Sequence, residues 1–298
     1  MPFDHATSFE FVRTLVRKRS GIVLGMEKDY LIQARLTTLS RKEGFDSITE
    51  LLDQTQSLLD QLDADCQHVL SEKVVEAMTT NETSFFRDQH PFECLRNYVL
   101  PDLLSRRAAE RSLNIWSAAC STGQEPYSVA MVLQEHFPEL HDWPVQLIAS
   151  DLATKCLERG REGRYSQMEV SRGLPAPRLA KFFSRRGLDW VVHDDLRRMI
   201  DFQQINLLDL DLDLALPQMD IVFLRNVLIY FDKETSQQIL GCIRRVLRPD
   251  GYLFLGGAET TLFLDDAFER VPLNQAGCYR LKNPSPTSQT RSVHDALS

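Results

Sequence analysis

The chain has 298 residues, of which 43% are hydrophobic and 26% charged, a composition typical of a globular protein with a sizeable core. Its 34 basic and 42 acidic side chains give a net charge of −8, which argues against a dedicated nucleic-acid-binding protein, because such proteins use clustered cations. No apolar run approaches the roughly 20 residues that cross a bilayer, and the N-terminal segment lacks a signal-peptide pattern. The six cysteines lack metal-binding spacing, so we expect a cytoplasmic protein with reduced thiols and no metal.

Residues 1–76 are predicted to form a small all-α domain. Apolar residues recur there with helical spacing, and no stretch alternates as a strand would. We expect Gly21 and Gly44 to end the first two helices, because glycine favours helix C-termini. The four apolar stripes cover residues 7–20, 28–42, 47–62 and 66–78.

Residues 113–283 are predicted to form an α/β domain with a parallel sheet covered on both faces. Short apolar runs alternate with helical segments, which favours this architecture. The runs begin at Leu113, Pro144, Phe202, Asp220 and Gly251. Residues 164–200 break the alternation and predict short inserted antiparallel strands around Arg186-Gly187. Residues 284–298 are rich in Ser, Thr and Pro and predict a disordered tail.

Polar residues follow several of the predicted strands, where ligands of open α/β sheets bind. The loop after the first strand holds small residues but no GxGxxG motif, so alone it is weak evidence for a cofactor. Asp151 follows the second strand and could either hold ribose hydroxyls or cap the next helix. Asn206 and Leu207 suit the edge and face of an adenine, whereas Arg225 requires either a ligand or a structural acidic partner.

Residues 77–112 form a predicted linker that begins with the segment TTNETSFFRD, residues 79–88. The segment is polar, then doubly aromatic, and has neither helical nor strand periodicity. One interpretation is an interdomain linker whose Phe85 and Phe86 are buried. The other is a functional motif.

Six segments together resemble the CheR family of chemotaxis-receptor glutamate methyltransferases. They are TTNETSFFRD, IWSAACSTGQEPYSVAM, ASDL, NLLD, FLRNVLIYFD and GYLFLGGAE, in this order. The resemblance covers about residues 8–282. It implies an all-α receptor-docking domain joined to a Rossmann-like S-adenosylmethionine-binding α/β domain with a small β insertion. The implied activity is methyl transfer to glutamate side chains of membrane-bound receptors, giving methyl esters and S-adenosylhomocysteine, by a monomer recruited to receptor arrays.

The resemblance also implies which residues act. Arg87 and Tyr230 are expected near the transferable methyl group. This reading favours Asp151 as a ribose ligand. Glutamate is ionised at neutral pH, so the implied reaction needs no general base, and no histidine lies in a motif. The implied cofactor contacts are Asn81, Thr83, Arg87, Glu125, Asp151, Asn206, Leu207, Arg225 and Asn226.

A basic surface is predicted on the N-terminal domain, since residues 11–42 carry eight basic and two acidic side chains, a net charge of +6. A solvated face is the plain interpretation. The receptor helices implied by the resemblance are rich in glutamate, so we favour docking. The residues expected to dock them are Arg13, Arg17, Lys18, Arg19 and Arg35. In some family members the β insertion binds a receptor's C-terminal peptide, and the sequence leaves that role open here.

Two other functions are alternatives to receptor methylation. A nucleic-acid or small-molecule methyltransferase is disfavoured, because amino-methylating enzymes carry an Asp/Asn-Pro-Pro-aromatic loop and this chain has no Pro-Pro. A non-catalytic signalling adaptor that binds S-adenosylmethionine or a second messenger is the second alternative. The intact Asn81, Arg87, Asp151 and Tyr230 count against it. Calorimetry with the cofactor and a methylation assay would separate adaptor from enzyme.

Overall fold

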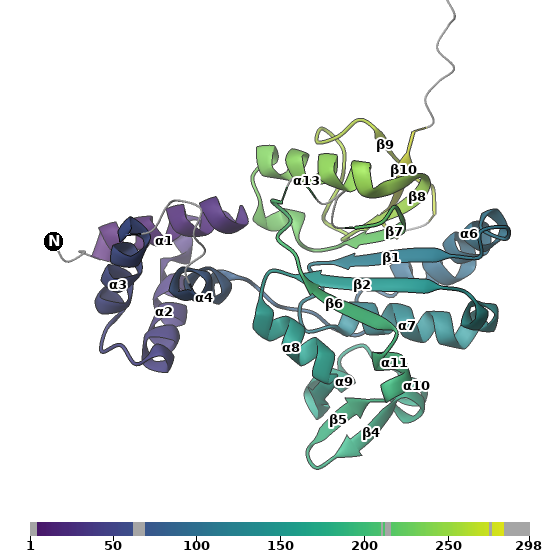
Figure 1. The fold of residues 1–298 in the computed structure, drawn as a ribbon, viewed down its shortest axis with the longest axis horizontal. Helices are drawn as coiled ribbons and strands as arrows, with labels where there is room; N and C mark the ends of the chain where they lie inside the picture. The colour runs from purple at the N-terminus through teal and green to yellow at the C-terminus, as the bar shows by residue number, and fades with distance from the viewer. Residues whose placement is uncertain (1–4, 62–68, 210, 212–215, 274–275, 283–298) are drawn as a thin grey trace, which may run out of the picture.

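A computed structural model describes residues 5–61, 69–209, 211, 216–273 and 276–282. A helical N-terminal domain stands beside a larger domain built around a seven-stranded sheet (Figure 1). The expected tail, residues 284–298, lies outside the described residues, as does Cys66 of the fourth apolar stripe. Within the described ranges, no helix combines the length and apolar character needed to cross a membrane.

Helices at all four predicted stripes make up the N-terminal domain. Their apolar faces, including Val12, Ile32, Leu51 and Val74, pack into one core. Gly44 ends the second helix in a left-handed conformation, with φ of 82°, and its N–H donates to the Ser40 carbonyl oxygen. The helices are α1 (His5–Ser20), η1 (Met26–Lys28), α2 (Asp29–Glu43), α3 (Ile48–Gln61) and α4 (Val69–Met78).

The seven-stranded sheet has the order β6-β2-β1-β7-β8-β10-β9. Its first five strands are parallel, as predicted, but β10 runs antiparallel to both β8 and β9. Sequence patterns gave no signal for these last two strands, because they are short and carry charged residues. The strands are β1 (Leu113–Ala118), β2 (Val145–Asp151), β6 (Ile200–Gln204), β7 (Met219–Leu224), β8 (Leu247–Leu255), β9 (Phe268–Arg270) and β10 (Cys278–Leu281).

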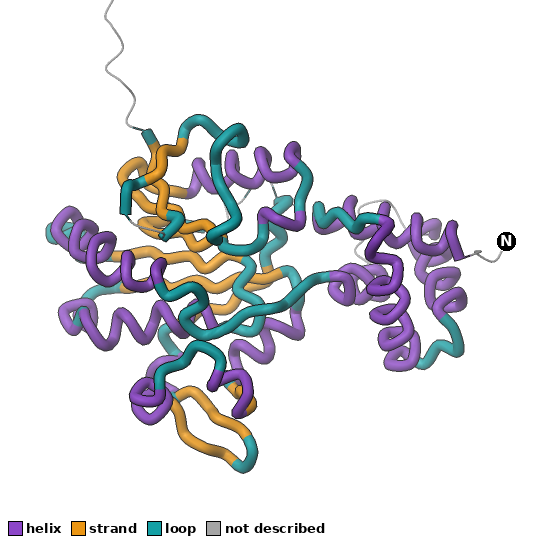
Figure 2. Tube along the Cα trace, turned by 180° about the vertical axis from the view of Figure 1, so that it is seen from behind, coloured by secondary structure: helices purple, strands orange, loops and turns teal. Residues whose placement is uncertain are grey.

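Helices cover both faces of the sheet (Figure 2). Alternate side chains of β1 point to opposite faces: Leu113 and Ile115 join one core, and Trp116 and Ala118 join the other. The first core is closed by α5 (His90–Cys94), η2 (Leu95–Val99), α6 (Leu100–Arg106), α7 (Gln124–His136), η3 (Pro138–Asp142) and α8 (Thr154–Glu162), and the second by α13 (Lys233–Val246).

The predicted β insertion is present as a three-stranded antiparallel sheet of order β3-β5-β4. Gly187, with φ of 64°, makes the predicted turn. Phe85 and Phe86 of the linker motif are buried, and the Phe85 ring lies 5.0 Å from that of Tyr165 in the insertion. The insertion comprises β3 (Arg164–Ser166), α9 (Gln167–Ser171), α10 (Ala176–Phe182), β4 (Phe183–Arg186), β5 (Asp189–Val192) and α11 (Asp194–Arg197).

The two domains are joined by backbone contacts as well as by the linker. Ile22 pairs with Phe231 in an antiparallel bridge, and the Val23 N–H donates to the Tyr230 carbonyl oxygen at 2.9 Å. Gly21 has φ of 74°, and a Cβ there would lie only 2.8 Å from Thr235 Cγ2. The end of α1 is therefore seated on the segment that follows β7.

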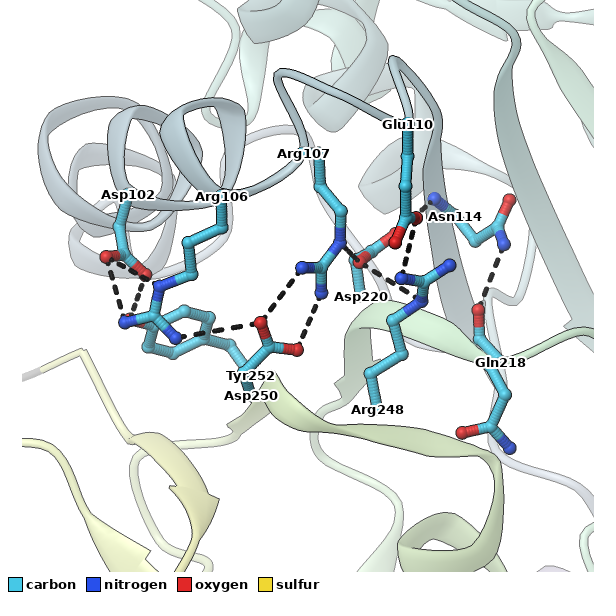
Figure 3. Close-up of polar contacts among 10 residues, drawn as sticks. All are labelled: Asp102, Arg106, Arg107, Glu110, Asn114, Gln218, Asp220, Arg248, Asp250 and Tyr252. Atoms are coloured by element: carbon cyan, nitrogen blue, oxygen red, sulfur yellow. Dashed lines mark hydrogen bonds and ion pairs between the residues drawn. The ribbon is translucent and has the colours of Figure 1, made fainter. Parts of the chain in front are cut away.

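A network of ion pairs links the end of α6 to β7 and β8, at the end of the sheet away from the N-terminal domain (Figure 3). The buried Arg107 donates from Nε to Asp220 at 2.7 Å and from Nη2 to Asp250 at 2.6 Å. Arg248 pairs with Glu110, 2.8 Å away. The register of β8 against β7 shifts between Met219, which pairs with Leu247, and Ile221, which pairs with Tyr252.

Candidate active site

A cavity of about 910 Å³, partly open to solvent, lies where β1, β2, β6 and β7 end. Its walls come from the end of α1, the linker and the loops after these four strands. All ten residues expected to act at the cofactor or the methyl group line it. They are Asn81, Thr83, Arg87, Glu125, Asp151, Asn206, Leu207, Arg225, Asn226 and Tyr230.

Asp151 connects two loops at the floor of the cavity. Its Oδ2 accepts from the Ser121 N–H at 2.8 Å and its Oδ1 from the Ala153 N–H at 2.9 Å. Burial raises the pKa of this carboxyl, while the hydrogen bonds from backbone N–H groups oppose that rise. A carboxylate has about four acceptor positions, so these two bonds leave capacity for hydroxyl donors.

The helix after Asp151 begins without a side-chain cap from its own segment. Instead, Glu76 of α4 accepts hydrogen bonds from the N–H and the hydroxyl of Thr154, both at 2.8 Å. Asp151 therefore accepts from the Ala153 N–H just before the helix, but it does not cap the first N–H of the helix itself, which bonds to Glu76. Sequence periodicity gave no signal for the Glu76 contact, since 78 residues separate the two groups.

Arg225 forms the centre of a buried charge network. Its guanidinium donates to Glu125 at 2.9 Å, to Asp88 at 2.7 Å and to the Arg87 carbonyl oxygen at 2.9 Å. The acidic partners expected for a buried cation are therefore present. The Arg225 Nε is buried and has no hydrogen-bond partner among the residues that the structure describes.

The loop after β1 adopts left-handed conformations at residues other than glycine. Ala119 and Ser121 have φ of 54° and 52°, and Gly123 follows with 94°. The Ser121 hydroxyl donates to the Asn81 carbonyl oxygen at 2.9 Å, which joins this loop to the linker motif. Such backbone strain concentrates at functional sites, and the small side chains were the one sequence signal for it.

Asn206 holds the junction between the domains. Its Nδ2 donates to the Arg19 carbonyl oxygen at 2.7 Å, and its Oδ1 accepts from the Leu208 N–H at 3.1 Å. Both ends of the Asn206 amide are thus hydrogen-bonded within the protein. Its position after a strand had suggested that the amide would be free to contact the edge of an adenine. Leu207, buried beside it, supplies an apolar wall.

The end of the cavity near Tyr230 is shared by both domains. Ser20 and Ile22 of the N-terminal domain line it, together with Phe231. Arg87 also lines the cavity and donates from Nη1 to the Glu82 carbonyl oxygen at 3.0 Å. The sequence pattern gave no indication that Ser20 and Ile22 contribute to the cavity.

The five predicted docking residues do not form one free surface. Arg13 is mostly buried and pairs with Asp29 and Glu10. Arg17 lies 2.6 Å from Asp232 at the junction with the α/β domain. The predicted docking residues are therefore not separate from the α/β domain, because α1 ends against that domain.

Lys18 and Arg19 lie along a second hollow between the domains. Arg35 reaches the wall of the cavity, where its Nη2 donates to the Thr80 hydroxyl at 3.4 Å. Partial burial lowers the pKa of Arg35, and the nearby Tyr230 hydroxyl opposes the shift. Arg35 thus connects α2 to the wall of the cavity.

These features define a class of protein. A Rossmann-like sheet, a cavity at the ends of its parallel strands and a buried acid after the second strand are together suited to a nucleoside-containing cofactor. The remaining acceptor capacity of Asp151 and the apolar wall at Leu207 fit the ribose hydroxyls and the base of S-adenosylmethionine. The fold and site are those of an S-adenosylmethionine-dependent methyltransferase.

Comparisons with known proteins give the family. Residues 81–276 match the model "CheR methyltransferase, SAM binding domain", and residues 7–72 match "CheR methyltransferase, all-alpha domain". The chain is 40% identical to chemotaxis protein methyltransferase 1 of Pseudomonas aeruginosa over 92% of this chain and 97% of that protein. It is 39% identical to chemotaxis protein methyltransferase Cher2 of Pseudomonas putida, over 92% and 98%. The chain belongs to the CheR methyltransferase family, and the resemblance found in the sequence is confirmed.

Proposed function

We propose that this enzyme methylates glutamate side chains of chemotaxis receptors and forms glutamyl methyl esters. The observation that carries the proposal is the position of the cavity, whose wall is completed by the end of α1, the helix that carries Arg17, Lys18 and Arg19. The curated relatives are named chemotaxis protein methyltransferases, which supports the same substrate class. The enzyme is proposed to act as a cytoplasmic monomer at membrane-bound receptor arrays.

The cavity residues divide into two proposed roles. Asp151 accepts hydrogen bonds from ribose hydroxyls, Leu207 packs on the base, and Glu125 faces the ammonium group of the methionine moiety. Asn81, Thr83 and Asn226 complete the cofactor's surroundings, and Arg225 holds Glu125 and the linker in place. Arg87 and Tyr230, which both line the cavity, are proposed to receive the substrate carboxylate.

The chemistry requires orientation rather than a base. When bound, S-adenosylmethionine supplies an electrophilic methyl group on a cationic sulfonium. The substrate carboxylate is already ionised at neutral pH, and no histidine is among the described residues lining the cavity. Arg87 orients that carboxylate by charge, and Tyr230 orients it by a hydrogen bond. Excluding water from the cavity strengthens both interactions.

The test is incubation of the enzyme with radiolabelled cofactor and receptor-containing membranes from the same organism. Base-labile label on the receptors is expected, because methyl esters hydrolyse in base. Label that survives base would contradict an ester product. Cofactor binding without any transfer would instead favour the adaptor alternative.

The rate of methyl transfer per bound receptor is expected to be nearly constant from about pH 6.5 to 8.5, because no enzyme group must lose a proton. Any fall at lower pH should follow protonation of the substrate carboxylate. Single-turnover measurements with saturating cofactor check this. A bell-shaped profile with a limb near neutrality would reveal a titrating enzyme group and contradict the mechanism.

Reversing three exposed charges of the N-terminal domain is expected to raise the apparent KM for receptor. The variant Lys18→Glu/Arg41→Glu/Lys42→Glu changes the local charge by about six units and leaves Arg17 and Arg35 with their partners. Wild-type methylation should also weaken with salt, because screening at about 0.15 M limits exposed charges to roughly 8 Å.

A matched control reverses three exposed arginines of the α/β domain, Arg96, Arg198 and Arg270. Affinity for S-adenosylhomocysteine should be unchanged in both variants, since none of the six residues lines the cavity. If the N-terminal variant methylates receptors normally at low salt, the basic surface is only a solvated face.

A further inference from the structure

The carboxylate of Glu259 is buried directly behind the segment that carries Asn226 and Tyr230. Glu259 is 8% exposed and lies four residues beyond the end of β8. Its Oε2 accepts from the N–H groups of Asn226 and Gly256, both at 2.7 Å. Its Oε1 accepts from the N–H groups of Val227 and Leu228 at 2.8 and 2.7 Å. One carboxylate thus satisfies four backbone donors.

Three of these donors are consecutive and belong to the turn that follows β7. Asn226 has φ of 58°, a conformation that a non-glycine residue adopts only where its surroundings impose it. Consecutive N–H groups in such a turn form an anion-binding concavity. Glu259 fills this concavity with a charge belonging to the protein, and without it three N–H donors beside the cavity would lack an acceptor.

The turn also leads into the short helix η4 (Leu228–Tyr230), which places Tyr230 at the cavity. Tyr230 then accepts from Val23, and Phe231 pairs with Ile22. The conformation of the turn therefore also affects the position of the backbone at Tyr230 and Phe231, where the N-terminal domain is hydrogen-bonded.

The surroundings of Glu259 leave little room for an alternative arrangement. A Cβ on Gly256 would lie 2.7 Å from Asn226 Nδ2 and 2.8 Å from Glu259 Oε2. Glu259 has no ion pair with a cationic side chain within the described part of the chain, so its charge is balanced by backbone dipoles alone.

We propose that Glu259 is a positioning residue, whose carboxylate sets the turn that presents Asn226 to the cofactor and Tyr230 to the substrate. The inference rests on the proposed function for the roles of Asn226 and Tyr230. It adds a residue that does not itself line the cavity and that acts through four backbone hydrogen bonds.

The experiment compares the full-length wild type with Glu259→Gln, which keeps the shape but turns one acceptor into a donor facing two N–H groups. Hydrogen–deuterium exchange of the protein without cofactor is expected to be about tenfold or more faster at residues 226–228, and unchanged in β7, because local protection depends on these bonds. S-adenosylhomocysteine affinity, measured by calorimetry, is expected to fall roughly fivefold or more. These two readouts do not depend on receptor methylation, so they remain informative if the proposed substrate is wrong.

Glu259→Asp serves as the second variant, because it keeps the charge but is shorter by one methylene. Its exchange rate and cofactor affinity should lie between those of wild type and Glu259→Gln. A control, Arg248→Ala, disturbs an ion pair at the far end of the sheet and should change neither readout. Wild-type affinity and exchange in a folded Glu259→Gln protein would overturn the proposal. Failure of both Glu259 variants to fold would also overturn it, since the residue would then be a general requirement of the fold.

Discussion

Replacing Asp151 with alanine is expected to weaken binding of S-adenosylhomocysteine by about 1.5–3 kcal/mol, or roughly 10- to 150-fold, the usual value of a hydrogen bond to a charged group. The variant removes the buried acceptor at the end of β2 but leaves the strand's backbone pairing with β1 intact. Isothermal titration calorimetry at pH 7.5 measures the effect. Unchanged affinity would remove Asp151 from the cofactor site.

The same residue predicts how cofactor affinity depends on pH. Burial raises the pKa of Asp151, so its carboxylate is protonated at a higher pH than an ordinary aspartate. Ribose hydroxyls donate to the ionised form, so affinity should be constant at neutral pH and fall as the pH decreases through the raised value. Asp151→Asn should lack this dependence. As a control, Asp201→Ala removes an exposed carboxylate of the neighbouring strand β6 and should keep wild-type affinity and pH dependence.

Arg107→Ala is expected to lower the free energy of unfolding by about 3–5 kcal/mol, because it leaves the buried Asp220 carboxylate without its closest cation. Asp220 has a second arginine, Arg248, but that side chain is 3.6 Å away and already paired with Glu110. Urea denaturation at pH 7 measures the loss. The control is Arg106→Ala, which breaks half-exposed ion pairs in the same helix and should cost no more than about 1 kcal/mol.

The stability difference between wild type and Arg107→Ala should shrink in acid. The Arg107 guanidinium holds the pKa of Asp250 below its usual range. A carboxyl whose pKa is lowered in the folded state stabilises the folded protein fully when the pH is above its pKa in the unfolded state, about 4. This stabilisation is lost as the pH falls through the lowered pKa of the folded state. Repeating the urea titrations from pH 7 to 3 tests the sign. A difference that grows below pH 4 would contradict this account of the pair.

Local sequence patterns were sufficient for most of the secondary structure. The apolar spacing of the four stripes, and Gly44 after the second, predicted the helices because helical geometry relates residues three and four apart. The five apolar runs predicted the parallel strands, because a parallel sheet is buried on both faces and its strands are therefore apolar along their length. Strand ends in a parallel sheet meet at one edge, which brought together Asp151, Asn206, Leu207, Arg225 and Asn226. The resemblance to the CheR family added Asn81, Thr83, Arg87, Glu125 and Tyr230.

Tertiary structure alone decided how these residues are held. Arg225 pairs with Glu125 across 100 residues of sequence, Asn206 bonds to Arg19 across 187, and Glu259 supports a turn more than 30 residues away. Periodicity describes only neighbours within a few residues, so it cannot report which distant partner satisfies a buried charge or amide. The sequence by itself therefore determined most of the elements and the edge of the sheet that holds the candidate site. The docking of α1 beside the cavity and the fixed geometry of its walls arose only from the packing of the folded chain.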